Sequence, residues 1–366
     1  MPRSIFVKSC PVGSSFRVEK VKGVFDLDSV SEVRREYDVD IPIEEKPWSI
    51  GLIVGSSGSG KTTIAHKCFP DFLFFTGFDW LAESMLDDFP AECSVDEITA
   101  ACGHVGLSSA PDWLKPFAVL SNGQKMRAEL ARLFLAEKNR PVIYDEFTSV
   151  VDRQVAQVSS YAISKFIRRN GQQFVAVSCH RDIEEWLNPD WVYDTDEMQF
   201  RWRCLRRKPD IQIDLREGSE SEWALFRPYH YLSTSHNKAA KKVVAEYKSV
   251  PVAWCSYLHF AHPLLKNMKR IHRLVVRPDY QGLGIGNALL NAIAAKLKGD
   301  GFRVSIVTSL GVFARSLSRN QSWCLVRQGF LGGGSKTAKK GLREIRTSKR
   351  LTASFEHVGA KEERGG

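Results

Sequence analysis

The residues with the clearest chemical potential stand in a glycine-rich stretch near the start of the chain. Residues 55–62 read Gly-Ser-Ser-Gly-Ser-Gly-Lys-Thr and fit the pattern G-x-x-x-x-G-K-[ST] without a mismatch. Glycines let such a loop turn its backbone N–H groups toward an anion, and a helix that begins at the lysine adds the positive end of its dipole. An ordinary glycine-serine turn is the alternative. The pattern predicts a site for ATP with Mg²⁺. Its candidate contacts are Gly55, Ser56, Ser57, Gly58, Ser59, Gly60, Lys61, Thr62 and Thr63.

A second glycine-rich stretch stands in the C-terminal half of the chain. Residues 281–286 read Gln-Gly-Leu-Gly-Ile-Gly, which fits Q-x-x-G-x-G and does not fit the dinucleotide pattern G-x-G-x-x-G. An apolar, strand-like run precedes it, and an amphipathic helical pattern follows. The order strand, turn, helix predicts a second anion site at a helix N-terminus, with a simple connecting turn as the alternative. Its candidate contacts are Val275, Val276, Gln281, Gly282, Leu283, Gly284, Ile285 and Gly286.

Apolar strands and one amphipathic helix must position the residues around the first glycine loop. Residues 50–54 form an apolar run directly before the loop. The run 142–144 leads into Asp145-Glu146, and the run 174–177 ends at Ser178-Cys179-His180. Leu120-Ser121-Asn122-Gly123-Gln124 opens a helical pattern. Acidic, histidine and glycine residues therefore stand at the ends of predicted elements.

The order of these motifs resembles the nucleotide-binding domain of ABC-type ATPases, with Asn122 at the first glycine of the signature motif. The resemblance implies that Thr62 and Asp145 hold Mg²⁺ and that Glu146 polarises the attacking water. It implies that His180 contacts the γ-phosphate. The alternatives are a structural acid for Glu146 and a core histidine for His180. It also implies that Ser121, Gly123 and Gln124 close on ATP held by another subunit, and hence a homodimer on ATP binding.

The chain departs from ABC transporter subunits in one respect. These proteins carry a glutamine between the glycine loop and the signature motif, where it touches Mg²⁺ and couples to a membrane partner. No glutamine lies between Lys61 and Gln124 here; Asp87 or Asp88 are the candidate substitutes. No run of about 18 apolar residues occurs either. We therefore expect no membrane partner and, with no signal-peptide pattern and scattered cysteines, a cytoplasmic protein.

The second glycine loop, with the phrase Leu-Val-Val-Arg-Pro-Asp-Tyr-Gln-Gly before it, resembles the acyl-CoA-binding core of GNAT-family N-acetyltransferases. The resemblance implies that the loop holds the pyrophosphate of acetyl-CoA or another acyl-CoA. His272 on the central strand is the candidate catalytic base, with a structural strand residue as the alternative. No tyrosine follows Tyr280, so the family's usual acid is absent; Ser309 and Cys324 are the candidates in its place.

The charge balance bears on partners. The formal net charge is +10. The chain beyond residue 330 carries nine Lys/Arg and four Glu, so its net charge of +5 is half of the total. Basic clusters attract the phosphates of DNA or RNA, although a solvated basic surface is the plain alternative. The stretch 226–233, Phe-Arg-Pro-Tyr-His-Tyr-Leu-Ser, is similar to pieces of Mom-type DNA-modifying acyltransferases of bacteriophages. This suggests a nucleic-acid base as acyl acceptor, unless these aromatics simply form a first helix and core.

The predicted fold class is α/β: an ABC-type P-loop domain followed by a GNAT-like mixed α/β domain. The expected boundaries are 1–209 for the ATP-binding domain with a shortened helical subdomain, 210–335 for the acyl-CoA-binding domain, and 336–366 for a basic segment with a last strand. The layout is similar to ABC-type ATPases fused to predicted acetyltransferases of bacteria and phages. We expect an ATPase coupled to acyl transfer; the alternatives are an ATP-switched clamp or regulator with an inactive second domain, and a transporter subunit.

Overall fold

The chain folds around two large β-sheets that belong to two separate compact units. The computed structural model describes residues 4–26, 32–138, 140–203, 212–230, 235–261, 267–331 and 350–359. The first unit comprises Met1–Thr76, Asn139–Val150 and Ile167–Arg206, and the second comprises Gly77–Lys138, Val151–Phe166 and Arg207–Gly366. The predicted boundaries at 209/210 and 335/336 lie outside the described residues and stay predictions.

The first unit is built on a six-stranded sheet with strand order β4-β5-β6-β3-β7-β8. The strands β3 to β7 are parallel to their neighbours, and β8 runs antiparallel to β7. Every residue of β3, β6 and β7 is buried, as the continuous apolar runs of a parallel sheet require. The bounds are β3 Ile50–Val54, β4 Leu73–Phe75, β5 Val142–Tyr144, β6 Phe174–Ser178, β7 Trp191–Asp194 and β8 Gln199–Trp202.

An antiparallel hairpin and short helices complete the first unit. The hairpin strands β1 and β2 pair from Ser4 with Val39 to Pro11 with Glu32. The sequence favours a strand over 16–25, but the structure forms a helix there, because Ser15 caps it and Glu19 pairs with Lys22 one turn on. The bounds are β1 Ser4–Pro11, α1 Phe16–Val24, β2 Glu32–Val39, η1 Ile43–Glu45, α2 Lys61–Cys68 and α7 Ile183–Leu187.

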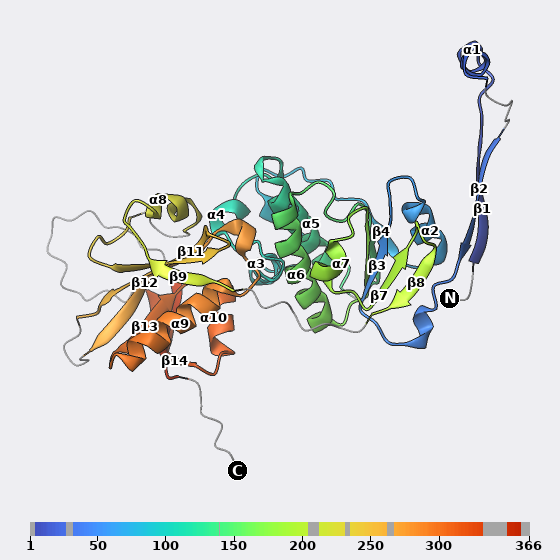
Figure 1. Ribbon diagram of the computed structural model, residues 1–366. Helices are drawn as coiled ribbons and strands as arrows, with labels where there is room; N and C mark the ends of the chain where they lie inside the picture. Colours follow the sequence, from blue (N-terminus) through green and yellow to red (C-terminus); the bar gives the residue numbers. More distant parts are fainter. Residues whose placement is uncertain are drawn as a thin grey trace. The chain divides into compact units, whose positions relative to one another are not determined.

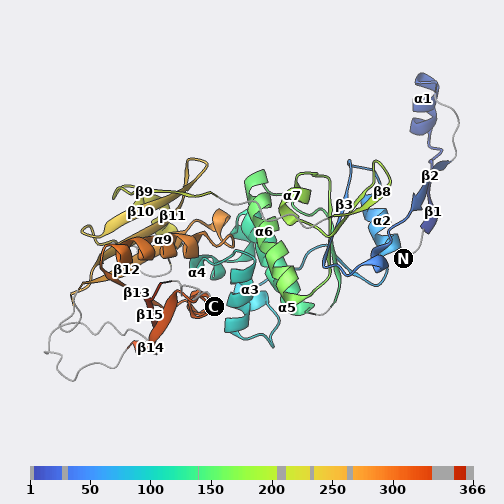
Figure 2. The same ribbon diagram turned by 60° about the horizontal axis from the view of Figure 1, so that its bottom comes forward.

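Helices dominate the part of the second unit that comes before residue 170. The helices α5 and α6 run side by side (Figures 1 and 2), with the Phe134 and Phe166 rings 4.6 Å apart. Helix α6 continues from the second unit into the first. The bounds are η2 Met85–Asp88, α3 Val95–His104, α4 Ala110–Trp113, η3 Phe117–Val119, α5 Asn122–Ala136 and α6 Arg153–Asn170.

The rest of the second unit is a seven-stranded sheet with strand order β14-β15-β13-β12-β11-β10-β9. All neighbours are antiparallel except β12 and β13, which are parallel and pair only from Met268–Arg303 to Arg270–Ser305. The strands are β9 Asp214–Glu217, β10 Lys241–Tyr247, β11 Val250–His259, β12 Met268–Val276, β13 Arg303–Thr308, β14 Trp323–Leu331 and β15 Arg350–His357. The helices are α8 Trp223–Phe226, η4 Arg227–Tyr229, η5 Pro278–Tyr280, α9 Ile285–Gly299 and α10 Gly311–Ser318.

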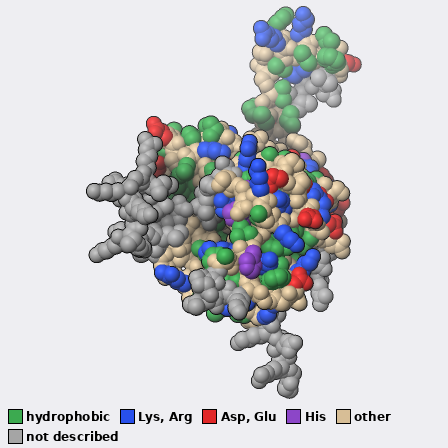
Figure 3. Space-filling view, turned by 90° about the vertical axis from the view of Figure 1, so that its left-hand side faces the viewer, with side chains coloured by type: hydrophobic (Ala, Val, Ile, Leu, Met, Phe, Trp, Pro, Cys, Tyr) green, Lys and Arg blue, Asp and Glu red, His purple; other side chains and the backbone are tan. Residues whose placement is uncertain are grey.

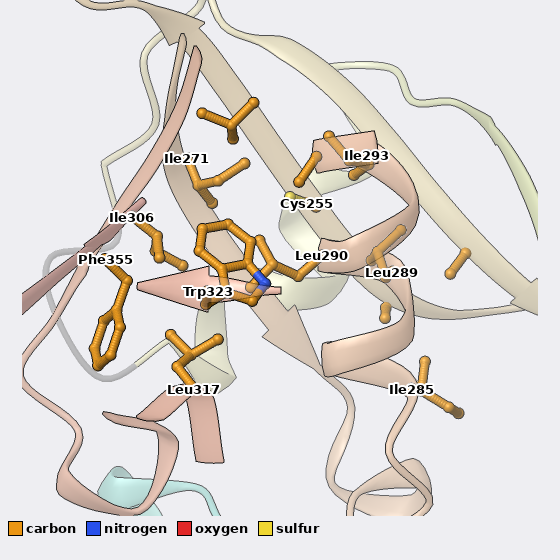
Figure 4. Close-up of a cluster of buried hydrophobic side chains, with 14 of the residues drawn as sticks. Cys255, Ile271, Ile285, Leu289, Leu290, Ile293, Ile306, Leu317, Trp323 and Phe355 are labelled. Atoms are coloured by element: carbon orange, nitrogen blue, oxygen red, sulfur yellow. The ribbon is translucent and has the colours of Figure 1, made fainter. Parts of the chain in front are cut away.

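The core of this sheet forms where α9 covers one of its faces. Leu290 from α9, Ile271 from β12 and Trp323 from β14 belong to one buried cluster, in which they lie together (Figure 4). A smaller cluster of Trp223, Phe226, Val244, Trp254 and Val275 is separate from it. Because Ile271 and Val275 stand on one strand but in different clusters, β12 has an α9 side and an α8 side.

The predicted fold class is confirmed. A parallel sheet with a glycine loop before a helix and a mixed sheet with two diverging parallel strands are the two α/β architectures that the sequence indicates. In the part of the chain that the structure describes, no helix combines the length and apolar character that a membrane crossing requires.

Candidate functional sites

The first glycine loop lies where β3 ends and α2 begins. Gly60, the N-cap residue of α2, has φ 99° and ψ 13°, a left-handed conformation that glycine adopts without strain. A Cβ at Gly60 would lie 2.5 Å from the Tyr37 hydroxyl oxygen, whereas a Cβ at Gly58 would meet nothing within 4 Å. The loop is therefore packed on its Tyr37 side and open at Gly58. Since the first N–H groups of a helix have no partner inside it, the loop fits an anion at the start of α2.

The two side chains predicted to hold Mg²⁺ contact each other. The Thr62 hydroxyl donates a hydrogen bond to Asp145 Oδ2 at 2.9 Å. Lys61 is 8% exposed, and its ammonium group donates to the carbonyl oxygen of Ser56 at 2.7 Å. A hydroxyl and a carboxylate at this distance are the oxygen donors that Mg²⁺ prefers. The residues present therefore fit a magnesium-bound nucleotide.

A carboxylate that the sequence analysis missed holds the start of the same loop. Asp196 accepts hydrogen bonds from the Ser56 N–H at 2.8 Å and from the Ser56 hydroxyl at 2.7 Å, and these bonds lower its pKa. Arg181 pairs with Asp196 at 2.9 Å and also with Asp194. The Ser56 N–H therefore already has a hydrogen-bond partner within the protein. The signal in the sequence is an acidic run directly after the strand that neighbours β3.

The N-terminal hairpin also reaches the loop. Lys8 donates to the Thr63 hydroxyl at 3.1 Å, and Arg35 donates to the Gly58 carbonyl at 3.0 Å. Both cations lie beside a predicted triphosphate site, which the sequence alone did not indicate. The resemblance to ABC-type ATPases implies an aromatic residue that stacks on adenine, and the sequence leaves Phe25 and Tyr37 as its candidates. Tyr37 is 4% exposed and packs in the core, whereas Phe25 is 68% exposed.

Acidic and histidine residues lie at the carboxyl ends of neighbouring strands in the first unit. Because β5, β6 and β3 are adjacent and parallel, Asp145, His180 and the glycine loop follow strands that end at the same edge. Glu146 has φ 51°, a strained conformation for a residue with a side chain, and the Ser149 hydroxyl donates to its Oε2 at 2.6 Å. His180 is partly exposed. This edge can present an acid, a base and an anion loop together.

The signature residues cap helix α5. The Ser121 hydroxyl accepts from the Gln124 N–H, and the Gln124 side chain accepts from the Ser121 N–H at 2.9 Å, which is a capping box. A Cβ at Gly123 would lie 2.4 Å from Val155 Cγ1, so this glycine is required by packing. These contacts are structural, and the predicted role of the three residues toward a second subunit stays a prediction.

One turn further along α5, a buried arginine joins this helix to the segment directly before the second glycine loop. Arg127 is fully buried, and its guanidinium donates to the carbonyl oxygens of Gly106 and Pro278. It also lies 3.5 Å from Asp279 Oδ1. A buried charge is stable only when it is paired and hydrogen-bonded, so this contact specifies one arrangement of the two segments. Pro278 lies 151 residues after Arg127, and the sequence gives no sign of this contact.

The second glycine loop leads into α9 as predicted. Gly284, the N-cap residue of α9, has φ 90° and ψ 5°, and a Cβ there would meet nothing within 4 Å. Gln281 accepts from the Ser108 N–H at 2.6 Å and donates to the Val276 carbonyl at 2.9 Å, which fixes the turn. Val275 and Ile285 are buried. An open left-handed turn at a helix N-terminus fits the pyrophosphate of an acyl-CoA.

The strand before this loop separates from its parallel neighbour. Past Arg270, β12 has no ladder pairing with β13, although both strands continue. Tyr257 of β11 pairs with Ile271 and Ser256 pairs with Arg273, so His272 is an extra, bulged residue of β12. Unpaired strand backbone can bind an extended ligand by adding a strand to the edge. The opening therefore suits the arm of an acyl-CoA, with the bulge at its closed end.

His272, the predicted catalytic base, lies among other groups that hold it neutral. Its Nε2 accepts a hydrogen bond from the Asn237 N–H at 3.2 Å. Burial, followed by the charges of Arg273 and His236, lowers the pKa of His272 to about 4. No observation assigns it a role in acyl transfer, so the catalytic role stays a prediction.

This lowered pKa gives a stability prediction. The unfolded chain binds a proton at His272 near pH 6.5, whereas the folded chain does so only near pH 4, so lowering the pH across this window favours unfolding. We expect the urea midpoint to fall between pH 7 and pH 4.5, and to fall less in His272→Gln. His236, whose pKa is lowered mainly by burial, acts in the same direction, so some pH dependence remains. An equal fall in both proteins would contradict the assignment.

One comparison with known protein families matches a range that includes β9 to β13 of the second sheet. Residues 181–317 match the model of the acetyltransferase (GNAT) family. This match spans less than half of the chain, so it identifies a GNAT acetyltransferase domain and not the whole protein. No curated protein matches the chain.

Solved structures of acetyltransferases and of ABC transporter cassettes resemble parts of the chain. An IAA acetyltransferase from Bacillus cereus has 17% identity over 40% of this chain and 99% of its own, with a TM-score of 0.30. The cbiO1 protein from Clostridium perfringens, part of the ABC transporter complex cbiONQ, has 17% identity over 44% of this chain and 76% of its own, with a TM-score of 0.36. The bacterial ABC transporter cassette MJ0796, described as dimeric, has 16% identity over 44% of this chain and 87% of its own, with a TM-score of 0.34. These scores are too low to assign an activity.

The visible surface gives no separate sign of a nucleic-acid site. On the face shown in Figure 3, Lys and Arg side chains are interspersed with acidic and apolar ones. Most of the basic C-terminal segment, residues 332–349 and 360–366, lies outside the described residues. Of the stretch 226–233, Phe226 and His230 are buried, so these two belong to the core.

Proposed function

We propose that the chain is an ATP-binding and ATP-hydrolysing ABC-type ATPase coupled to an acyl-CoA-dependent N-acyltransferase. The observation that supports this most is the pair of left-handed glycines, Gly60 and Gly284, each opening a helix at the end of a strand. ATP with Mg²⁺ would supply a hydrolysable phosphoanhydride, and the acyl-CoA an activated acyl group. Lys61 and the amides of residues 57–62 would hold the phosphates, and Thr62 and Asp145 the metal.

The other residues have defined tasks in this proposal. Glu146 would take a proton from water at the first site, and His180 would orient that water. The amides of residues 282–286 would hold the CoA pyrophosphate, and the unpaired edge of β12 would hold its arm. ATP-dependent pairing of two copies would use Ser121, Gly123 and Gln124. The acceptor would be an amine, and a nucleic-acid base is one candidate class.

Coupling between the two activities rests on the contact of Arg127 with the segment directly before the second glycine loop. Arg127 follows the signature residues by one helical turn and donates to the Pro278 carbonyl, three residues before Gln281. A change in the position of α5 would therefore move the backbone that precedes the CoA loop. This gives a physical route by which nucleotide binding can alter acyl-CoA binding.

The coupling can be tested by substituting Arg127. Arg127→Met leaves buried carbonyls without a donor, at a cost of about 1–3 kcal/mol each. We therefore also use Asp279→Asn, which keeps every donor of Arg127 and removes only the charge paired with it. We expect both variants to keep ATP hydrolysis and acyl-CoA turnover but to lose the dependence of turnover on ATP. Arg132→Met on the same helix, whose arginine contacts Phe78, Asp79 and Trp80, is the control. ATP-dependent turnover in both variants would contradict this route.

The alternative is an ATP-switched clamp or regulator whose GNAT domain has lost acyl transfer. The absence of any tyrosine after Tyr280 favours it, because the family's usual acid is then missing. Release of CoA thiol from acetyl-CoA, measured with and without ATP, separates the two functions. Mass spectrometry of DNA, RNA and metabolites from cells expressing the protein would identify an acceptor. Tight acetyl-CoA binding without thiol release in any assay would favour the regulator.

A further inference from the structure

A cluster of histidines lies on the α8 side of β12, opposite the face that α9 covers. His236 packs against two tryptophans that also contact each other, with its ring centroid 5.3 Å from Trp223 and 5.5 Å from Trp254. The His272 ring is 5.5 Å from the His236 ring. Because His272 is the bulged residue at the closed end of the opening between β12 and β13, this histidine cluster borders the place where the acyl group would lie.

His236 has the geometry of an oriented base. Its side chain is 1% exposed, and its Nδ1 lies 3.2 Å from a carboxylate oxygen of Glu220. Lys242 lies 3.3 Å from the same carboxylate oxygen, which keeps Glu220 ionised. The carboxylate can only accept, so Nδ1 carries the hydrogen and Nε2 carries a lone pair, as assigned from the network.

Like the indole N–H of Trp254, the Nε2 atom of His236 is an unexplained group in this cluster. It is buried and has no hydrogen-bond partner among the described residues. An unsatisfied buried acceptor costs about 1–3 kcal/mol, so native structures keep few of them without a reason. The corresponding atom of His272 differs, because it already accepts from the Asn237 N–H. Of the two rings, His236 therefore has the free lone pair.

We propose that His236, oriented by Glu220, is the general base for the acceptor amine in acyl transfer; this rests on the proposed acyltransferase function. The amine nitrogen attacks the thioester carbonyl carbon and forms the C–N bond, and His236 Nε2 takes the amine proton directly or through one water. The C–S bond then breaks, and the leaving CoA thiolate takes the proton from the imidazolium. The products are an amide and free CoA thiol, with no other reactant consumed. Glu220 stabilises the transient imidazolium through Nδ1.

The test measures acetyl-CoA binding by calorimetry and, separately, CoA thiol release with hydroxylamine as the probe amine, from pH 6 to 9. In His236→Gln we expect kcat/KM to fall about 10²–10⁴-fold with acetyl-CoA binding unchanged, since positioned bases contribute about that factor. In Glu220→Gln we expect a smaller loss and a shift of the acid limb of the pH profile. His259→Gln, an exposed histidine on β11, is the matched control.

The outcomes separate the role of His236 from the acyltransferase function on which it rests. Wild-type kcat/KM and pH profile in a folded His236→Gln would overturn the role of His236 and leave the acyltransferase function standing. A fall in acetyl-CoA binding equal to the fall in kcat/KM would also overturn it, because the ring would then be structural. Acetyl-CoA binding without thiol release in the wild type would overturn both His236 and acyl transfer. No acetyl-CoA binding at all would reject the CoA site itself.

Discussion

Replacing Glu146 with glutamine is expected to lower the rate of ATP hydrolysis by about 10²–10⁴-fold while ATP binding is kept, because a positioned base contributes about that factor. Glutamine has the same shape but cannot take a proton from water. Glu146 follows a strand end adjacent to the glycine loop, in a left-handed conformation with φ 51° that the neighbouring Ser149 supports. A strained conformation held by a hydrogen bond is common where a side chain must point at a reacting group. Phosphate release under single-turnover conditions, with nucleotide binding measured in parallel, gives both quantities.

The design separates catalysis from folding. Glu185→Gln changes an exposed glutamate on α7 of the same unit and should hydrolyse ATP at the wild-type rate. If two copies pair on ATP, Glu146→Gln should accumulate as the pair in the presence of ATP, since hydrolysis no longer separates them. Hydrolysis by Glu146→Gln at the wild-type rate would make Glu146 a structural acid and remove the proposed base.

Local patterns in the sequence were sufficient to predict both glycine loops. Each loop depends on glycines whose positive φ is a property of the residue itself, and on a strand and a helix encoded by neighbouring residues. The runs 50–54, 142–144 and 350–357 form the strands β3, β5 and β15 as expected. Where local signals conflict, the prediction fails: the valines of 16–25 favour a strand, but Ser15 and the Glu19–Lys22 pair stabilise a helix with no buried residue.

The contacts that surround the sites could not be predicted because they join distant parts of the chain. Asp196 caps the Ser56 N–H across 140 residues, and Arg127 donates to Pro278 across 151. A charged residue in a sequence gives no sign that it will be fully buried, as Arg127 is. The same limit applies to His236, whose lone pair becomes notable only once Glu220 and the two tryptophans are seen around it. The sequence located the two glycine turns, and the structure added the residues that hold them.

Replacing Gly284 with aspartate is expected to weaken acyl-CoA binding by about two to three orders of magnitude. Gly284 is the N-cap of α9, and a side chain there would enter open space with nothing within 4 Å, where the pyrophosphate would lie. At an effective dielectric constant of about 20, like charges about 4 Å apart repel by about 4 kcal/mol, and each 1.4 kcal/mol is tenfold in affinity. Solvent screening reduces this to the expected range. Calorimetric titration with acetyl-CoA gives the affinity.

Two matched variants isolate the charge from the backbone. Gly284→Asn has nearly the same shape as aspartate, and asparagine also tolerates the left-handed conformation that φ 90° demands, so it should bind acetyl-CoA far better than Gly284→Asp. Gly299→Asp places the same charge at the other end of α9, where a Cβ also meets nothing within 4 Å, and should leave binding unchanged. Equal losses in the aspartate and asparagine variants would mean that backbone strain disables the turn. Unchanged acetyl-CoA binding in Gly284→Asp, Gly284→Asn and Gly299→Asp would show that acyl-CoA does not bind at the start of α9. ATP hydrolysis would then be the one proposed activity left to test.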